Sequence, residues 1–349
     1  MTVPVLTFFN NKGGVGKTSL VYHLSSMFAE LGVRVLAVDL DPQANLTAAF
    51  LDEAQLEMLW EDEQSVSTLF DSVKPLLDVG DFAPVNYQTI HSRLALVPGD
   101  LRLSSFEDEL SSTWTHAMNE KNKTRPFRIL TAFWRSAQEA AERFEASLIV
   151  IDVGPNLGAI NRAALLSSNY VIVPLGADLF SLQGLRNLGP TLREWQQEWN
   201  KRRNSWAQPE FALPQGDMKP VGYIAMRHGV RLSRPVQAYT RWLDKIPGEF
   251  RRSVLDEEVH NRQLPSINTD PYCLSMLKDY KSLVPLGQEA RKPIFSLTVA
   301  DGAGGSHAHA AQQAFEDFKE LAQKIALHTS GFTRKNNAPH LRLEKQAAG

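Results

Sequence analysis

The sequence predicts an α/β protein with a doubly wound, mostly parallel sheet flanked by helices. Four apolar runs have the length and composition of buried parallel strands, at residues 3–9, 34–39, 148–152 and 170–176. Segments with apolar residues at helical spacing separate these runs, an alternation typical of doubly wound folds. The chain has 349 residues, of which 43% are hydrophobic, so it can bury a large core. We therefore expect a single domain over residues 1–330, followed by a polar, basic tail at 331–349.

A glycine-rich loop follows the first apolar run and leads into a helical pattern over residues 20–28. Its sequence is Asn10-Asn11-Lys12-Gly13-Gly14-Val15-Gly16-Lys17-Thr18-Ser19. Strand, glycine loop and helix in this order indicate a phosphate-binding loop, with backbone N–H groups and a helix N-terminus around the phosphates. Lys17 can reach the β- and γ-phosphates, and the Thr18 hydroxyl can bind Mg²⁺. We expect residues 11–19 to bind a nucleotide.

This loop carries one lysine more than phosphate binding needs. A plain P-loop would have glycine at position 11, whereas here Asn11 stands there and Lys12 follows it. The run from Lys12 to Thr18 resembles the deviant Walker A motif of the ParA/MinD superfamily of P-loop ATPases. The resemblance implies that Lys12 reaches across an ATP-sandwich homodimer to the phosphates of the partner subunit. It also implies that Lys12 and Lys17 take part in catalysis, with ATP and Mg²⁺ as ligands.

The second and third strands each end in carboxylates that match the family's acidic motifs. Residues 34–45 read Arg-Val-Leu-Ala-Val-Asp-Leu-Asp-Pro-Gln-Ala-Asn, and residues 148–155 read Leu-Ile-Val-Ile-Asp-Val-Gly-Pro. By this resemblance Asp41 orients the water that attacks the γ-phosphate, and Asp39 lies nearer the water shell of the metal. Asp152 is the Walker B residue, which holds Mg²⁺ through water.

Later segments extend the resemblance over roughly residues 3–330. Residues 170–185 resemble the strand and turn that follow Walker B in the family. Residues 291–295, the glycines before Ser306 and the helical run at 310–325 resemble its closing section. Adenine contacts in such folds come from the later loops, so we expect them from Met226, Arg227 and Pro293.

The number of cysteines and the length of the apolar segments bear on the protein family and on the cellular compartment. Cys273 is the single cysteine of the sequence, which excludes an intramolecular disulfide and favours a reducing compartment. It also argues against the nitrogenase iron protein, which needs two cysteines per subunit for its cluster. No apolar stretch approaches the ~18 residues of a membrane span, and the tail lacks the apolar face of a membrane-binding helix. We expect a cytoplasmic, nucleoid-associated protein without a membrane partner.

Charge is spread unevenly, although the net charge is only −2. Residues 51–110 contain 13 acidic and 3 basic residues, whereas residues 219–252 contain 8 basic and 2 acidic ones. Clustered arginines are typical of surfaces that bind nucleic-acid phosphates without reading bases. The family binds DNA through basic residues in this later part of the fold. We expect duplex DNA to contact Arg231, Arg234, Arg251 and Arg252, and Lys201, Arg202 and Arg203 could extend that surface. A solvated basic face is the alternative.

The sequence as a whole predicts a ParA-like ATPase that dimerises on ATP, binds DNA non-specifically and is reset by partner-stimulated hydrolysis. Its cargo would be a plasmid, a chromosomal origin or another large assembly, and its partner a ParB-like or other stimulating protein. An elaborated acidic region at about 51–130 could dock a partner or could simply face solvent. The alternative function is an ATP-dependent dimeric switch that docks a protein without binding DNA. A MinD-like membrane cycle is a third possibility, against which the tail argues.

Overall fold

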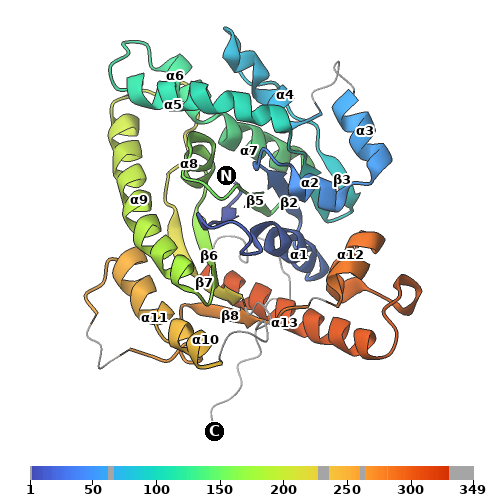
Figure 1. The fold of residues 1–349 in the computed structure, drawn as a ribbon. Coiled ribbons are helices and arrows are strands. Elements are labelled where there is room, and N and C mark those ends of the chain that lie inside the picture. Colours follow the sequence, from blue (N-terminus) through green and yellow to red (C-terminus); the bar gives the residue numbers. More distant parts are fainter. Residues whose placement is uncertain (1, 62–66, 227–235, 260–263, 281, 330–349) are drawn as a thin grey trace.

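The computed structural model describes residues 2–61, 67–226, 236–259, 264–280 and 282–329. Its centre is an eight-stranded sheet with the order β3-β4-β2-β5-β1-β6-β7-β8 (Figure 1). Neighbouring strands are parallel except for β3 and β4 at one edge, which pair antiparallel. The predicted doubly wound, mostly parallel sheet is therefore confirmed.

The strands of the sheet are β1 (Val5–Phe8), β2 (Val35–Asp39), β3 (Gln88–His91), β4 (Leu94–Val97), β5 (Leu148–Asp152), β6 (Tyr170–Gly176), β7 (Lys219–Met226) and β8 (Cys273–Leu277). Of these, β1, β2, β5 and β6 coincide with the four predicted apolar runs. The central strands β1, β2 and β5 are buried on both faces, which explains their unbroken apolar sequence. Because parallel strands end at one edge of the sheet, the segments that follow β1, β2, β5 and β6 come together there.

Helices cover both faces of the sheet. They are α1 (Lys17–Glu30), α2 (Asn45–Phe50), α3 (Glu53–Glu61), α4 (Leu69–Val73), α5 (Glu107–His116), α6 (Thr124–Leu130), α7 (Ala132–Phe144), α8 (Ala159–Leu166), α9 (Leu179–Asn204), α10 (Val236–Leu243), α11 (Ile246–Glu249), α12 (Val284–Ala290) and α13 (Ser306–His328). One core lies beneath α1 and α13, and a second lies beneath α7, α8 and α9. No helix among the described residues is both long and apolar enough to cross a membrane.

The acidic region at 51–130 is part of this fold. It contains α3 to α6 and the strands β3 and β4, of which β3 lies at the edge of the sheet and β4 pairs with β2. Figure 1 shows α5 and α6 along one side of the molecule, next to the start of α8 and the end of α9. The tail at 331–349 lies outside the described residues.

Candidate nucleotide site

The glycine-rich loop connects β1 to α1 at the carboxyl edge of the sheet. Gly14 and Gly16 have φ angles of 71° and 81°, a backbone region that favours glycine. Gly16 is the N-cap of α1 and lacks a side-chain cap, so the first N–H groups of the helix are directed at the loop interior. This is the geometry of an anion-binding helix terminus.

Lys17 points back into the loop. Its Nζ donates to the carbonyl oxygens of Asn10 at 3.1 Å and Lys12 at 3.3 Å. Burial lowers the pKa of this ammonium, and the carboxylates of Asp152 and then Asp41 counter that effect. A buried cation that is held by carbonyls and faces two carboxylates is placed to bind phosphate oxygens.

Lys12 is directed at a different partner from that of Lys17. Its Nζ lies 2.5 Å from Oδ2 of Asp178, and the two side chains are 32% and 20% exposed. Asp178 is also the N-cap of α9, because its Oδ1 accepts from the Ser181 N–H at 2.9 Å. The two lysines of one loop thus have different partners and different directions.

Asp152 is fully buried at the end of β5. Among the residues that the structure describes, none forms a hydrogen bond with either of its carboxylate oxygens. Burial raises its pKa well above the ordinary value, the Asp39 carboxylate raises it further, and the nearby Thr18 hydroxyl lowers it. A buried carboxylate without a partner, beside a hydroxyl, fits a divalent cation such as Mg²⁺.

Asp39 is buried at the end of β2 and accepts hydrogen bonds from within the protein through both carboxylate oxygens. Its Oδ2 accepts from the N–H and hydroxyl of Thr47, at 2.8 and 2.7 Å, and its Oδ1 accepts from the Asp41 N–H. Burial raises the pKa of Asp39 to about 7. Oδ2 of Asp39 thus holds the start of α2 and Oδ1 holds the turn at Asp41, so Asp39 has a structural role, and the metal roles predicted for Asp39, Thr18 and Asp152 stay predictions.

Asp41 lies between the acidic strand end and the Walker B loop. Its Oδ1 accepts from the Gln43 N–H at 3.0 Å, and a Cβ added to Gly154 would lie 3.4 Å from the same oxygen. Its carboxylate is close enough to Lys17 to act on the pKa of that ammonium. Asp41 therefore lies beside Lys17 and the Walker B loop, and its role toward the attacking water stays a prediction.

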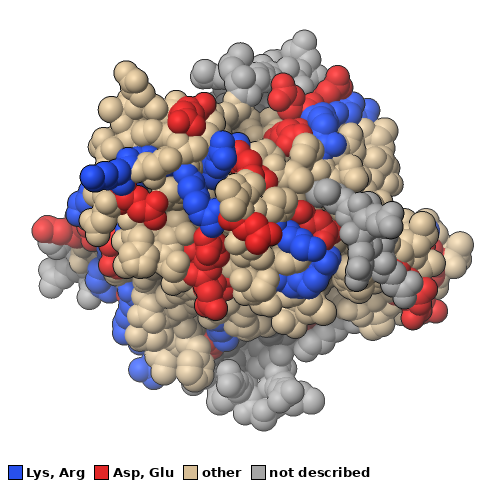
Figure 2. All heavy atoms as spheres, turned by 90° about the horizontal axis from the view of Figure 1, so that it is seen from above, with Lys and Arg blue, Asp and Glu red and all other residues tan. Residues whose placement is uncertain are grey.

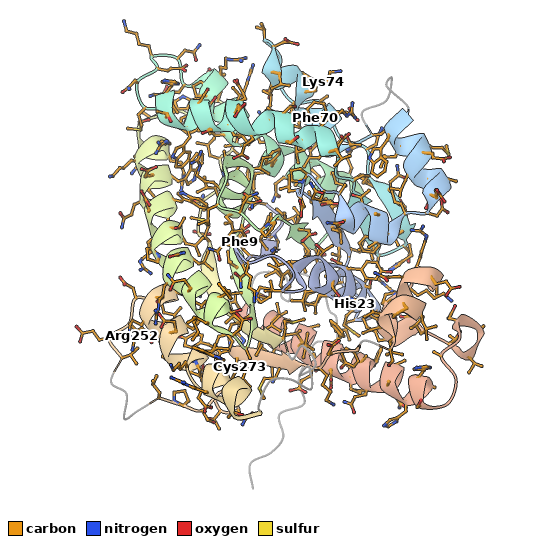
Figure 3. All side chains as sticks on the ribbon, in the orientation of Figure 1. Phe9, His23, Phe70, Lys74, Arg252 and Cys273 are labelled. Carbon is orange, nitrogen blue, oxygen red and sulfur yellow. The ribbon has the colours of Figure 1, made fainter. Side chains whose placement is uncertain are left out.

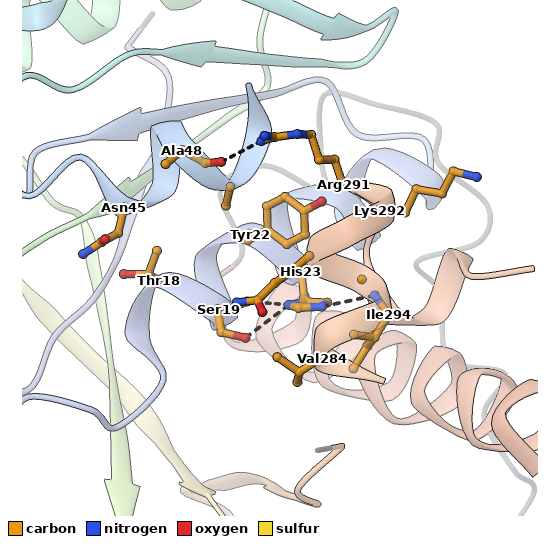
Figure 4. Close-up of a pocket in the computed structure, with 13 residues that line it drawn as sticks. Thr18, Ser19, Tyr22, His23, Asn45, Ala48, Val284, Arg291, Lys292 and Ile294 are labelled. Carbon is orange, nitrogen blue, oxygen red and sulfur yellow. Dashed lines mark hydrogen bonds between the residues drawn. The ribbon is translucent and has the colours of Figure 1, made fainter. Parts of the chain in front are cut away.

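A cavity of about 540 Å³ adjoins the loop between α1, α2 and α12 (Figure 4). It begins at Thr18 and Ser19 and is lined farther along by Tyr22 and His23 of α1. His23 is buried, with Nδ1 bonded to the Ser19 carbonyl at 2.7 Å and Nε2 accepting from the Ile294 N–H at 3.2 Å. The apolar pattern at 20–28 predicts the helix that carries Tyr22 and His23, but it does not predict that these two side chains line a cavity.

The three predicted adenine residues have different outcomes. Met226 ends β7 beside the loop, since its methyl carbon would lie 3.1 Å from a Cβ on Gly16. Pro293 immediately precedes Ile294, which contacts His23, but is itself absent from the residues that line the cavity. Arg227 lies outside the described residues.

The predicted DNA contacts also separate. Arg231 and Arg234 lie outside the described residues. Arg251 is only 13% exposed and forms an ion pair with the buried Asp270 at 2.6 Å, so its guanidinium is held inside the molecule. Arg252 is 53% exposed and lies at the edge of the molecule (Figure 3). We therefore keep Arg252 as a DNA candidate and leave Arg251 out.

Arg202 was expected to extend the basic surface, but it is buried. Its guanidinium lies 3.8 Å from the ring centre of Trp114 and donates to the Trp114 carbonyl oxygen. Arg202 is therefore a buried link between α9 and α5, whereas Lys201 stays exposed.

The acidic region does not form a uniform acidic face. Figure 2 shows acidic and basic side chains side by side on the face seen from above. Arg102 pairs with Asp71 and Asp100, and Arg135 pairs with Asp81. The excess of acidic residues along the chain is thus partly neutralised by contacts within the fold.

Comparisons with known proteins identify the family of the chain. Residues 3–204 match the family described as AAA domain, and the chain belongs to it. The chain is 28% identical to the sporulation initiation inhibitor protein Soj of Bacillus subtilis, over 56% of this chain and 67% of Soj. It is 30% identical to the chromosome partitioning protein ParA of Caulobacter vibrioides, over 57% of this chain and 65% of that protein. These matches span about two thirds of the relatives' own length.

Solved structures share the fold. A protein from Corynebacterium diphtheriae has a TM-score of 0.66 at 22% identity, covering 94% of this chain and 99% of that one. A Cyanothece McdA variant in complex with ATP has a TM-score of 0.59 at 14% identity, covering 94% and 97%. The family match and the curated relatives place the chain in the ParA/MinD superfamily, among the partition ATPases. The resemblance drawn from the Walker motifs is confirmed.

Proposed function

We propose that this protein is a partition-type ATPase that forms an ATP-sandwich homodimer and binds duplex DNA without sequence preference. Hydrolysis of ATP, stimulated by a ParB-like or other partner, resets it. The observation that carries the proposal is the divergence of two lysines from one loop. Lys17 is held by carbonyl oxygens inside its own loop, whereas Lys12 is partly exposed and pairs with Asp178, where a second subunit would bring its own phosphates.

The residues of the site have separate roles in this proposal. Lys17 and the N–H groups at the start of α1 would bind the phosphates, and Thr18 and Asp152 would hold Mg²⁺. When bound, Mg²⁺ neutralises charge on the β- and γ-phosphate oxygens. Asp41 would orient the attacking water, because its carboxylate is beside both Lys17 and the Walker B loop.

The start of α9 suits burial between two subunits. Leu179 and Phe180 directly follow the Asp178 that holds Lys12, and Phe180 is 72% exposed. Large exposed apolar side chains beside a charged group are typical of the centre of a protein interface. A dimer formed around Lys12 would cover them.

The proposed DNA surface consists of four exposed cations, which are Arg186 on α9, Arg241 on α10, Lys245 between α10 and α11, and Arg252 directly after α11. Arg186 and Arg252 share the carboxylate of Glu249, which leaves the group with a net positive charge. Dimerisation would double this surface, and DNA affinity should then depend on ATP and fall sharply with salt.

The decisive experiment measures ATP-dependent dimerisation and binding to random duplex DNA at ~50 and ~200 mM salt. The parent should dimerise and bind DNA with ATP only, and Lys12→Ala should bind ATP as a monomer. Arg252→Ala should weaken binding to all duplexes and flatten the salt slope, while Lys319→Ala on α13 serves as a charge-matched control. A parent dimer with no affinity for DNA at low salt would favour the protein-docking switch instead.

A further inference from the structure

Glu107 lies outside every motif that identifies the family, yet its carboxylate reaches the start of α8. Glu107 is the first residue of α5, and its Oε2 accepts from the Ile160 N–H at 2.8 Å. Its Oε1 accepts from the Ala159 N–H. These are the first two N–H groups of α8, which have no partner within the helix, and a carboxylate also stabilises the positive end of the helix.

Helix α8 follows the Walker B loop and holds it in place. Asn161, on the first turn of α8, donates through Nδ2 to the carbonyl oxygens of Gly154 at 2.9 Å and Asn156 at 2.7 Å. Gly154 in turn packs against Asp41, whose Oδ1 would lie 3.4 Å from a Cβ on that glycine. A continuous set of contacts therefore leads from Glu107, through α8 and Asn161, to the surroundings of Asp41.

The contact with Glu107 depends on the small size of Gly158. A Cβ added to Gly158 would lie 2.5 Å from Oε1 of Glu107, closer than nonbonded atoms approach. Gly158 has a φ of −74°, which any residue can adopt, so the absence of a side chain matters here through space and not through backbone conformation.

Helix α5 is itself firmly held, so the position of Glu107 is well defined. The Trp114 indole donates to Oε2 of Glu198 at 2.8 Å. The guanidinium groups of Arg162 from α8 and Arg202 from α9 lie 4.4 and 3.8 Å from its ring centre. Cation–π contacts and hydrogen bonds thus join α5 to both helices.

We infer that Glu107 is a positioning residue for ATP hydrolysis, which fixes the loop after Asp152 against Asp41. This inference rests on the proposed ATPase activity and adds a residue to it. Glu107 contacts α8 and not the phosphate loop, so its loss should lower kcat while ATP affinity is kept.

The test compares Glu107→Gln and Gly158→Ala with the control Asp108→Asn. Glutamine keeps the length but turns an amide donor toward a backbone donor, and the alanine methyl group pushes the unchanged carboxylate away. Asp108 is exposed on the same helical turn, so its variant loses the same charge elsewhere. We expect kcat to fall about tenfold in both test variants, with the Kd of a fluorescent ATP analogue within about twofold of the parent. Asp108→Asn should match the parent.

Amide hydrogen exchange at residues 159 and 160 provides a readout that does not need activity. Exchange there should speed up in Glu107→Gln and stay unchanged in Asp108→Asn. If the kcat of Glu107→Gln equals that of the parent, the inference is overturned and the proposed function is left intact. A parent that binds ATP without hydrolysing it would overturn the proposed activity, and with it the catalytic part of the inference. If Glu107→Gln fails to fold, the inference is overturned when the kcat of Gly158→Ala equals that of the parent.

Discussion

Replacing Asp178 by asparagine should strengthen ATP-dependent dimerisation. The ion pair between Lys12 and Asp178 is partly exposed, so it contributes about 0.5–1 kcal/mol after solvent screening. If Lys12 must leave Asp178 to reach the partner's phosphates, each dimer breaks two such pairs. Loss of the Asp178 charge should then favour the ATP dimer by about 1–2 kcal/mol, or roughly 5- to 30-fold in its dissociation constant.

Asparagine separates this effect from the capping of α9. Asp178 also accepts the Ser181 N–H through Oδ1, and asparagine is as good an N-cap as aspartate. Asp178→Ala, which loses both interactions, is the matched comparison and should be less stable to urea by about 1 kcal/mol. Sedimentation with a non-hydrolysable ATP analogue measures the dimer constant. A dimer of Asp178→Asn no tighter than the parent's would refute competition between Asp178 and the partner's phosphates.

Three further predictions concern the phosphate site, a buried ion pair and a buried histidine. Lys17→Ala should abolish ATP binding, whereas Asp41→Ala should keep it and slow hydrolysis; equal loss of affinity for a fluorescent ATP analogue would contradict these roles. Arg251→Ala should lower the free energy of unfolding in urea by about 3 kcal/mol, because it leaves the buried carboxylate of Asp270 without its counter-ion. Arg252→Ala should lower it by less than ~0.5 kcal/mol, and equal effects of the two variants would be inconsistent with the ion pairs described. Burial lowers the pKa of His23 to about 4, so its contribution to stability is complete above pH ~6.5 and is lost as the pH falls toward 4. In His23→Gln the urea midpoint should therefore change less with pH over that interval than in the parent. A pH dependence as steep as the parent's would contradict the reasoning.

The sheet and the phosphate loop could be predicted because their signals are local. A strand buried on both faces needs an unbroken apolar run, and β5 coincides with the predicted run at 148–152. The loop needs glycine where φ is positive, as at Gly14 and Gly16, and a lysine at the start of the helix. Each requirement appears within about ten residues of sequence.

The arginine-rich surface could not be predicted because the availability of a cation depends on distant partners. Arg251 counts as a positive charge in sequence, but Asp270 lies 19 positions away and neutralises it inside the fold. Arg202 is 88 positions from Trp114, whose ring and carbonyl oxygen enclose it. A local excess of basic residues therefore overestimates the charge that reaches the surface.

The same reason explains why the contacts on either side of the phosphate site were missed. Asp178 meets Lys12 across 166 positions, and Glu107 meets the start of α8 across 52. Asp178 caps α9, which begins inside the recognised segment 170–185, and Glu107 caps α8, which follows the Walker B run at 148–155; these segments contain no signal for the distant partner. Helix α5 joins these two helices through Glu107 and Trp114. A displacement of α5 would therefore reach the start of α8 through Glu107 and, through Asn161, the loop beside Asp41.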